Sequence, residues 1–153
     1  MSEIGAPLDF TICVDRSFKQ TYPEWVKGLM HPELELVGPT TYNLKNGVQQ
    51  WIHGQQKRGL LKGQVIYDHL KASNELANHL GLTDLLAIQA KGILVFRSLY
   101  VDNMVFGWRS VMRNSNGNLH VPCLFQDGCG VALDWDWLDR NWDSSRPALR
   151  FGK

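Results

Sequence analysis

The sequence predicts an α+β fold in which a mostly antiparallel sheet carries about three helices on one of its faces. Apolar and polar residues alternate one by one near both ends of the chain, which is typical of half-buried strands. Between about residues 48 and 92, apolar residues instead recur every three or four positions, which is typical of amphipathic helices. The chain of 153 residues is long enough for one hydrophobic core, and we expect a single domain over residues 1–153.

The last third of the chain predicts a three-stranded antiparallel meander over residues 104–138. Turns rich in Gly, Asn and Asp, at residues 114–117 and 126–130, separate its three alternating segments. Pairing these segments symmetrically about the turns places one apolar set on the core face: Trp108, Cys123, Leu133, Trp135 and Trp137. A slip of one residue would move the tryptophans into solvent, so we expect this register.

Four polar side chains would share the opposite face of the meander: Arg109, His120, Asp134 and Asp136. The expected register sets His120 directly across from Asp136, and a neighbouring carboxylate should raise the pKa of the histidine. Pro122 lies in the middle segment, where its nitrogen cannot donate a hydrogen bond. We therefore expect a bulge at Pro122, or missing pairing on one side of its strand.

Outside the meander, short strands are predicted by alternation or by β-forming residues at four places: residues 8–14, 33–37, 40–44 and 93–100. Pro23 suits the first turn of a short helix, because its missing N–H would have no partner there. These N-terminal strands would join the sheet that the meander begins.

The middle of the chain predicts the helices. Apolar spacing favours one helix over residues 48–57 and a second stretch over residues 65–80, as one long helix or two abutting ones, with Gly81 at its end. A further helix would take Thr83 as its N-cap, run through Ile88 and stop at Gly92. About three helices would therefore cover the sheet.

Composition and charge exclude several classes of partner. The sequence is 44% hydrophobic and 20% charged, with a net charge of +1, so no global attraction to nucleic acid or to anionic membranes is expected. No purely apolar run is longer than the four residues of Ile93–Phe96, and the start of the sequence has no signal-peptide pattern, so we expect a cytoplasmic protein. The three cysteines form no Cys-x-x-Cys motif and should stay reduced.

The charges are nevertheless distributed unevenly. Residues 45–71 hold five basic side chains against one acidic, whereas residues 127–143 hold five acidic side chains against one basic. These opposed patches could serve a partner, or could attract each other within the fold or across a dimer.

Three segments carry a resemblance: Val121–Leu124, Leu133–Leu138 and Pro147–Phe151. Their aromatic and turn positions resemble small uncharacterised bacterial proteins of the kind found in accessory and mobile genes. The similarity covers roughly the last two thirds of the chain and includes no catalytic signature. It implies an accessory gene product and assigns no functional residue.

The sequence holds no phosphate-binding loop, dinucleotide fingerprint, zinc-protease motif or nucleophile elbow. One candidate constellation is the polar face of the meander, with His120, Asp134, Asp136 and Arg109. A histidine oriented by a carboxylate, beside a second carboxylate and an arginine, could perform acid–base chemistry or hold a divalent ion. The alternative is ordinary charge pairing across strands on a solvated sheet face.

A second constellation lies around the glycine-bearing turn after residue 50: Trp51, His53, Lys57, Arg58 and Lys62. Backbone N–H groups and basic side chains at such a turn could bind phosphate, although clustered charge in a turn is more often simply solvated. His69 belongs to the apolar stripe of its helix and is expected to pack. Trp142 could line a ligand cleft, or could staple the C-terminal tail to the sheet.

We therefore predict a small non-catalytic binding or interaction module with an unknown ligand or protein partner. A homodimer through an aromatic or sheet-edge surface is one form of it, and no cofactor or metal is expected. The alternative is a small hydrolase or metal-dependent enzyme that uses His120, Asp134 and Asp136. A third option is phosphate or nucleic-acid binding through residues 57–62, which the balanced net charge makes less favourable.

Overall fold

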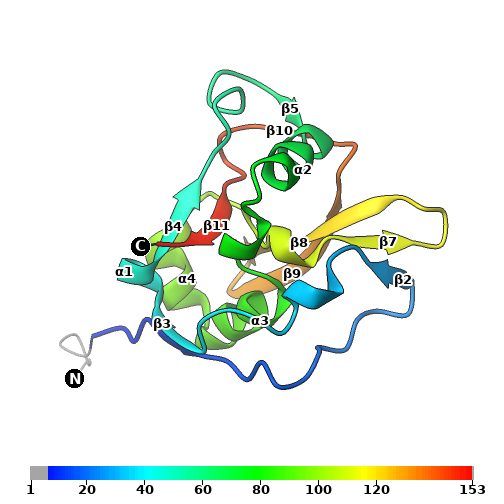
Figure 1. Ribbon diagram of the computed structural model, residues 1–153. Helices are drawn as coiled ribbons and strands as arrows, with labels where there is room; N and C mark the ends of the chain where they lie inside the picture. Colours follow the sequence, from blue (N-terminus) through cyan, green and yellow to red (C-terminus); the bar gives the residue numbers. More distant parts are fainter. Residues whose placement is uncertain (1–6, 153) are drawn as a thin grey trace.

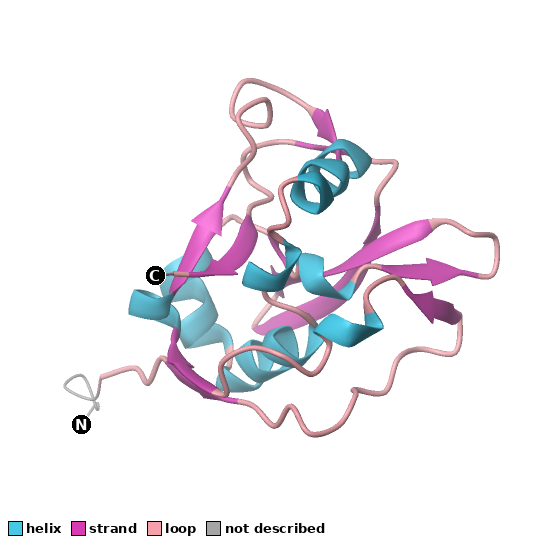
Figure 2. Ribbon diagram, viewed as in Figure 1, coloured by secondary structure: helices cyan, strands magenta, loops and turns pink. Residues whose placement is uncertain are grey.

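Strand β8 is the centre of a mixed sheet that has seven strands within residues 7–152, the part of the chain that the computed structural model describes. The strands follow the order β2-β7-β8-β6-β11-β4, and β9 pairs with the other edge of β8 (Figures 1 and 2). Their bounds are β2 Val26–Leu29, β4 Val48–Trp51, β6 Val105–Phe106, β7 Met112–Asn114, β8 Leu119–Asp127, β9 Gly130–Trp137 and β11 Ala148–Phe151. The α+β class is confirmed.

Two small antiparallel pairs accompany this sheet. They are formed by β1 Thr11–Cys13 with β3 Thr41–Asn43, and by β5 Leu61–Lys62 with β10 Asn141–Trp142. The α-helices are α1 Leu44–Gly47, α2 Gly63–Ala72, α3 Leu82–Lys91 and α4 Ile93–Tyr100. Short 3₁₀ turns are η1 Pro32–Leu34, η2 Leu76–Asn78 and η3 Trp108–Ser110.

Helices cover both faces of the sheet, not one face as the sequence predicts. Leu124 of β8 belongs to the core cluster of α3 and α4, whereas its neighbour Cys123 belongs to the cluster of α2 (Figure 1). Successive side chains of a strand point to opposite faces, so an apolar residue at both positions requires a cover on both sides.

The first strand of the predicted meander is broken in two. β6 and β7 both pair with the same edge of β8, and the three residues of η3 lie between them. Val121 and Pro122 fall in the gap, since β6 pairs only with Cys123 and Leu124 and β7 only with Leu119 and His120. The missing N–H of Pro122 thus coincides with an interruption on one side of its strand, as predicted.

In both hairpins, β7–β8 and β8–β9, the register differs by one residue from the prediction, and the turns explain why. Asp127 pairs with Gly130, so the second hairpin has a two-residue loop in which Gly128 has φ +62°. The first hairpin closes at Asn114, whose side chain accepts the N–H of Asn118, and Gly117 has φ +83°. Tight loops with glycine at a positive φ are the favoured hairpin connections, whereas the prediction assumed symmetric, wider turns.

The shifted register moves the tryptophans, as such a slip must. His120 now pairs with Trp137, and Trp137 is 40% exposed instead of lying in the core. Trp135 is half-buried, whereas Trp108 is buried as expected, although in η3 and not in a strand. Trp142 is fully buried against Phe106, with ring centroids 4.4 Å apart, so it is part of the core and lines no cleft.

Residues 48–51 form a strand where a helix is predicted, because β4 pairs with β11 almost a hundred residues later in the chain. Conversely, residues 93–100 form helix α4 where a strand is predicted. The buried side chains of α4 explain this, because Val95 and Phe96 lie on the same helical face as Tyr100.

Several predicted boundaries also change. Residues 33–37 contain η1 and no strand, and the helix predicted at Pro23 is replaced by a turn that leads into β2. Gly81 is the N-cap of α3, and does not end the preceding helix. The stop of α3 at Gly92, which has φ +94°, is confirmed.

The opposed charge patches meet within the fold. β5 and β10 bring Lys62 to Asp139, with Nζ and Oδ1 3.2 Å apart, on a surface where both side chains are more than half exposed. Over the part of the chain described, none of the helices is both long and apolar enough to cross a membrane.

Candidate functional site

The predicted polar face of the meander does not exist as a site. Asp134 and Asp136 pair with Cys123 and Val121, so they share the face of α2, and His120 points to the other face. There the ring of His120 lies 5.2 Å from that of Trp25. Burial lowers the pKa of His120 despite the two carboxylates, which is the opposite of the predicted direction.

Asp136 is occupied by other partners. Its Oδ2 accepts a hydrogen bond of 2.6 Å from Nη1 of Arg146, and its Oδ1 lies 3.6 Å from Nε of Arg140. The same Oδ1 accepts the N–H of Trp137, and Asp134 likewise accepts the N–H of Trp135. Among residues 7–152, no group of three or more His, Cys, Asp or Glu side chains is arranged to hold a metal ion.

Arg109 is also absent from the predicted face, because η3 turns it into the interior. It is 2% exposed and donates to the backbone carbonyls of Val37 and Ala77. Burial lowers its pKa, while the nearby carboxylate of Asp84 acts in the opposite direction. The interruption at Pro122 thus removes Arg109 from the sheet surface.

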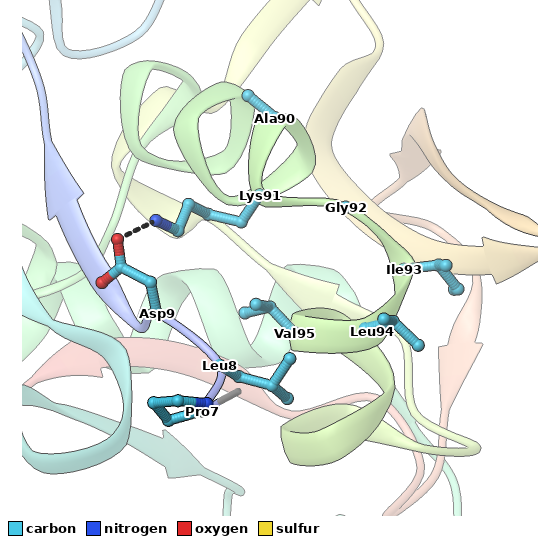
Figure 3. A pocket seen from close by; sticks show the side chains of 9 residues that line it. All are labelled: Pro7, Leu8, Asp9, Ala90, Lys91, Gly92, Ile93, Leu94 and Val95. Atoms are coloured by element: carbon cyan, nitrogen blue, oxygen red, sulfur yellow. Dashed lines mark hydrogen bonds and ion pairs between the residues drawn. The ribbon is translucent and has the colours of Figure 1, made fainter. Parts of the chain in front are cut away.

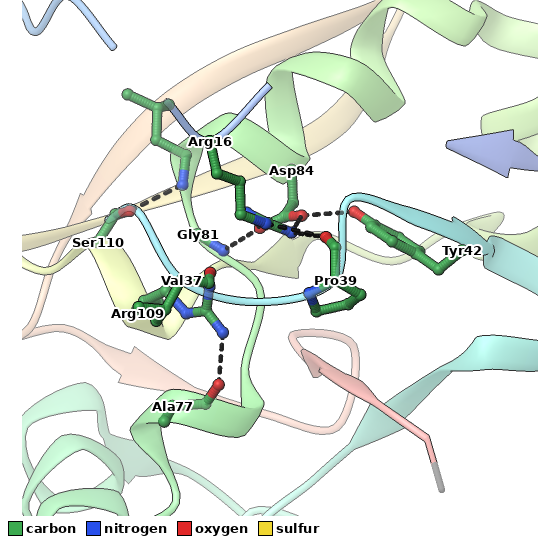
Figure 4. Close-up of polar contacts among 10 residues, drawn as sticks. Arg16, Val37, Pro39, Tyr42, Ala77, Gly81, Asp84, Arg109 and Ser110 are labelled. Carbon is green, nitrogen blue, oxygen red and sulfur yellow. Dashed lines mark hydrogen bonds and ion pairs between the residues drawn. The ribbon is translucent and has the colours of Figure 1, made fainter. Parts of the chain in front are cut away.

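Arg109 belongs to a largely buried polar network that we call the Asp84 clamp: Arg16, Tyr22, Glu35, Tyr42, Asp84, Arg109 and Ser110. Figure 4 shows the part of the clamp around Asp84 and Arg109. Asp84 accepts hydrogen bonds from Arg16 at 2.8 Å, from the Tyr42 hydroxyl at 2.6 Å and from the Gly81 N–H at 3.0 Å. The clamp therefore ties the N-terminal segment to the start of α3.

The second carboxylate of the clamp is Glu35, which accepts hydrogen bonds from the hydroxyls of Tyr22 and Ser110. Burial raises the pKa of Glu35, a perturbation that also occurs in active sites. Here, however, the space among the clamp residues holds no room for a water molecule. The clamp has no place for a substrate, and its arrangement is that of a structural anchor.

A groove of about 540 Å³ lies between residues 7–9 and the junction of α3 with α4 (Figure 3). Lys91 donates to Asp9 at 3.0 Å in this groove, and the other side chains that line it are aliphatic. An ion pair on an aliphatic wall supplies neither a nucleophile nor a ring to orient a ligand, so this groove lacks the convergent polar groups of a ligand site.

The strongest convergence of functional side chains surrounds Trp51, at the end of β4. The rings of His53, His69 and His79 lie with their centroids 6.1, 5.9 and 6.0 Å from that of Trp51. The ring of His69 is stacked on Trp51 at an interplanar angle of 9°, and His53 meets His69 edge-on at 4.9 Å. Three of the five histidines in the sequence, from three separate segments, thus form what we call the Trp51 cluster.

Hydrogen bonds fix different neutral tautomers for two of these histidines, His79 and His53. His79 donates from Nδ1 to the carbonyl of Glu75 at 2.9 Å, so its buried Nε2 carries a lone pair, and no partner for it is found within the described residues. Burial lowers the pKa of His79 to about 4. Nδ1 of His53 instead accepts the N–H of Gln55 at 3.1 Å, so neutral His53 carries its proton on Nε2.

A basic loop and a polar groove adjoin the cluster. Lys57 and Arg58 lie exposed in the loop that leaves β4, and no ion pair of theirs is found within residues 7–152. Figure 1 shows this loop between β4 and β5. A groove of about 380 Å³ is lined by Gln49, Glu75, Asn78, Arg150, Phe151 and Gly152. It lies near His79, because Arg150 bridges to His79 and the carbonyl of Glu75 accepts from the His79 ring. Alternation along β4 puts Gln49 on the same face as Trp51.

The sequence therefore identifies only part of this site. Trp51, His53, Lys57 and Arg58 stay together as predicted, but Lys62 pairs with Asp139 and Trp142 is in the core. His69, His79 and Arg150 were missed, because each comes from a distant segment. Strand β11 brings Arg150 beside β4, Arg150 bridges to His79, and α2 carries His69 to Trp51. The ten-residue separation of the two histidines carries no local signal for a shared site.

Comparison of the chain with family models, with curated proteins and with solved structures finds no match. The resemblance to bacterial accessory-gene proteins therefore stays a prediction, and the function is argued from the site alone.

Proposed function

We propose that the protein is a small cytoplasmic, non-catalytic binding module whose ligand site is the Trp51 cluster with its adjoining groove. The observation that carries this proposal is the convergence of three histidine rings on one half-exposed tryptophan, beside unpaired basic side chains. Aromatic rings with a few convergent polar groups are typical of ligand sites, and a groove of about 380 Å³ is within the usual size for a small ligand.

The polar groups of the groove suit recognition better than catalysis. Its described lining offers two side-chain amides, a guanidinium and a carboxylate, and neither a hydroxyl nor a thiol. The predicted catalytic group of His120, Asp134 and Asp136 is not assembled, because His120 lies on one face of the sheet and the two aspartates lie on the other. Binding is therefore the function that these side chains support best.

The test is an NMR titration that follows the imidazole and indole signals. The panel contains three classes at millimolar concentration: nucleoside monophosphates, N-acetylated amino acids and monosaccharides. We expect at least one class to shift the signals of Trp51, His53 and His69. Replacing His69 with Ala should weaken this binding several-fold, because His69 is the exposed ring of the stack.

Leu94→Ala is the control, because Leu94 is an exposed residue of α4, and the buried residues of α4 belong to a different core cluster from the one against which Trp51 packs. If no class shifts the cluster, or if His69→Ala binds as the control does, the proposal is wrong.

A homodimer is a second proposal, and the aromatic surface of the meander favours it. Trp25 and Trp137 are each 40% exposed, and the ring of Trp25 packs 5.9 Å from that of Trp135. Pairing through the free edge of β9 is disfavoured, because the N–H groups of Trp135 and Trp137 already bond to Asp134 and Asp136. Sedimentation equilibrium of wild type and of Trp25→Ser/Trp137→Ser, over a 100-fold range of protein concentration, tests this proposal. A wild-type protein that is still a monomer at the highest concentration of the series rejects it.

A further inference from the structure

We infer that the Trp51 cluster binds a phosphorylated nucleoside, either as a free nucleotide or within a short single strand. This inference rests on the proposed function and names the chemical class of its ligand. Three observations carry it: a stacking ring, two cations in the loop after β4 that have no ion pair among the described residues, and hydrogen-bonding side chains in the groove near His79.

The stacking surface is His69. It lies nearly parallel to Trp51 at 5.9 Å, and it is exposed whereas Trp51 is half-buried. The pair therefore forms a two-layer stack whose outer layer meets solvent. A nucleobase can continue such a stack as a third layer, because every base has a π-face and histidine is among the side chains on which bases stack.

The phosphate would be held by the loop that follows β4. Lys57 and Arg58 have no carboxylate partner among the described residues, in contrast to Lys62 and Lys71, which are paired. Burial lowers the pKa of His53, and the nearby charge of Arg58 adds to this lowering. Arg58 also lies five residues after His53, in the loop that begins at the cluster. Neutral His53 can also donate a hydrogen bond from Nε2 to a phosphate oxygen.

The base edge would meet the groove. Gln49 pairs with Arg150 across β4 and β11, and Nε of Arg150 donates weakly to Gln49 Oε1 at 3.4 Å, which leaves the terminal guanidinium nitrogens for a ligand. Asn78 adds a second amide from η2. Amide side chains bond the edge of adenine in two places, and guanidinium groups do so with guanine.

The charge of the whole molecule limits the ligand to a short one. A net charge of +1 cannot attract a long duplex, whereas two or three local cations are sufficient for one phosphate group. Inorganic phosphate alone would leave the stacking ring and the groove unused. A nucleoside with a phosphate uses all three features.

The experiment is a calorimetric titration with adenosine, inorganic phosphate, AMP and a five-residue oligodeoxyadenylate. We expect AMP to bind at least tenfold more tightly than adenosine or phosphate, and to bind more weakly when the salt is raised from 50 to 200 mM. Lys57→Gln/Arg58→Gln should reduce the AMP affinity to that of adenosine. Lys45→Gln/Lys91→Gln, which removes the same charge elsewhere, should leave AMP binding unchanged.

The two nucleotide sources are distinguished by the same titration. Tighter binding of the oligonucleotide than of AMP assigns the site to a single strand, and equal binding assigns it to a free nucleotide. If AMP binds no better than adenosine, or if the Lys57/Arg58 variant binds AMP as wild type does, the inference is wrong. If another class of the NMR panel then binds at the Trp51 cluster, the proposed function survives without it, whereas no binding of any class rejects both.

Discussion

The Asp84 clamp and the Trp51 cluster both collect polar side chains from distant segments, yet they differ in how those groups are satisfied. In the clamp, Asp84 accepts from a guanidinium, a hydroxyl and a backbone N–H, and no water fits between the partners. In the Trp51 cluster, His79 Nε2 has no described partner, and Lys57 and Arg58 are exposed without carboxylates. Within the clamp, Nε of Arg109 is buried without a partner among the described residues, so the contrast holds for the carboxylate and not for every clamp atom. The difference indicates that the fully bonded carboxylate of Asp84 fastens the fold, whereas the Trp51 cluster and its loop keep groups free for a ligand.

The largest effect should come from breaking the clamp. Asp84→Asn leaves the buried guanidinium of Arg16 without its charged partner, and we expect a loss of about 3–5 kcal/mol in the free energy of unfolding. Denaturant titration measures it. Asp134→Asn is the control, because Asp134 is exposed, and it should change stability by no more than about 0.5 kcal/mol. Equal effects of the two variants would contradict the structural role of the clamp.

The second effect is a pH dependence from the Trp51 cluster. Burial lowers the pKa of His79 from 6.5 to about 4, so the unfolded chain takes up a proton at a higher pH than the folded chain. The contribution of neutral His79 to the free energy of unfolding is therefore fully present above pH 6.5, and it is lost as the pH drops toward 4. At about 1.4 kcal/mol per pKa unit, the loss is about 3 kcal/mol.

Unfolding free energies of wild type and His79→Gln between pH 7 and pH 4 isolate this contribution. The variant should lose less stability on acidification than wild type does, and His69→Gln, at an exposed position, serves as the control. A parallel decline of wild type and His79→Gln would show that His79 is not held neutral.

The third effect tests an intermediate case. Asp136 is nearly buried and is bonded to Arg146, whose side chain is 28% exposed. Asp136→Asn should therefore cost about 1–3 kcal/mol, less than Asp84→Asn, because solvent can reach the arginine that is left unpaired. Thermal unfolding of both variants in one buffer provides the ranking. The reverse order would mean that burial does not separate the two carboxylates.

The smallest effect should come from the basic loop. Lys57→Ser/Arg58→Ser removes two exposed charges without ion pairs, and we expect the free energy of unfolding to change by no more than about 0.5 kcal/mol. Denaturant titration of this double variant sharpens the comparison. A large loss of stability would assign the loop to the fold and not to a ligand.

Local patterns predicted the presence of several elements but not their partners. The helix that stops at Gly92 and the hairpins about Gly117 and Gly128 follow from nearby residues, since capping and turn geometry are local. The predicted pairing registers of the two hairpins are wrong by one residue, because the register of a hairpin depends on the length of its loop. That error placed His120 beside Asp136, and it created a catalytic face that the fold does not contain.

The candidate site shows the same limit. Trp51, His53, Lys57 and Arg58 are close in sequence, so composition alone suggested a basic, aromatic site around them. The segment was nevertheless predicted to be helical, and its pairing with β11 decides otherwise. Propensity is a weak preference that long-range pairing overrides.

By itself, the sequence determined the α+β class, the alternation of β8 and β9, and the basic, aromatic segment that begins at Trp51. Each of these depends on neighbours within a few residues, where spacing and turn chemistry act directly. Only the tertiary structure decided that Arg109 is buried, that Asp136 pairs with Arg146 and that His69 and His79 meet Trp51. These contacts join segments far apart in the chain, and the burial and packing that select among them are properties of the whole fold.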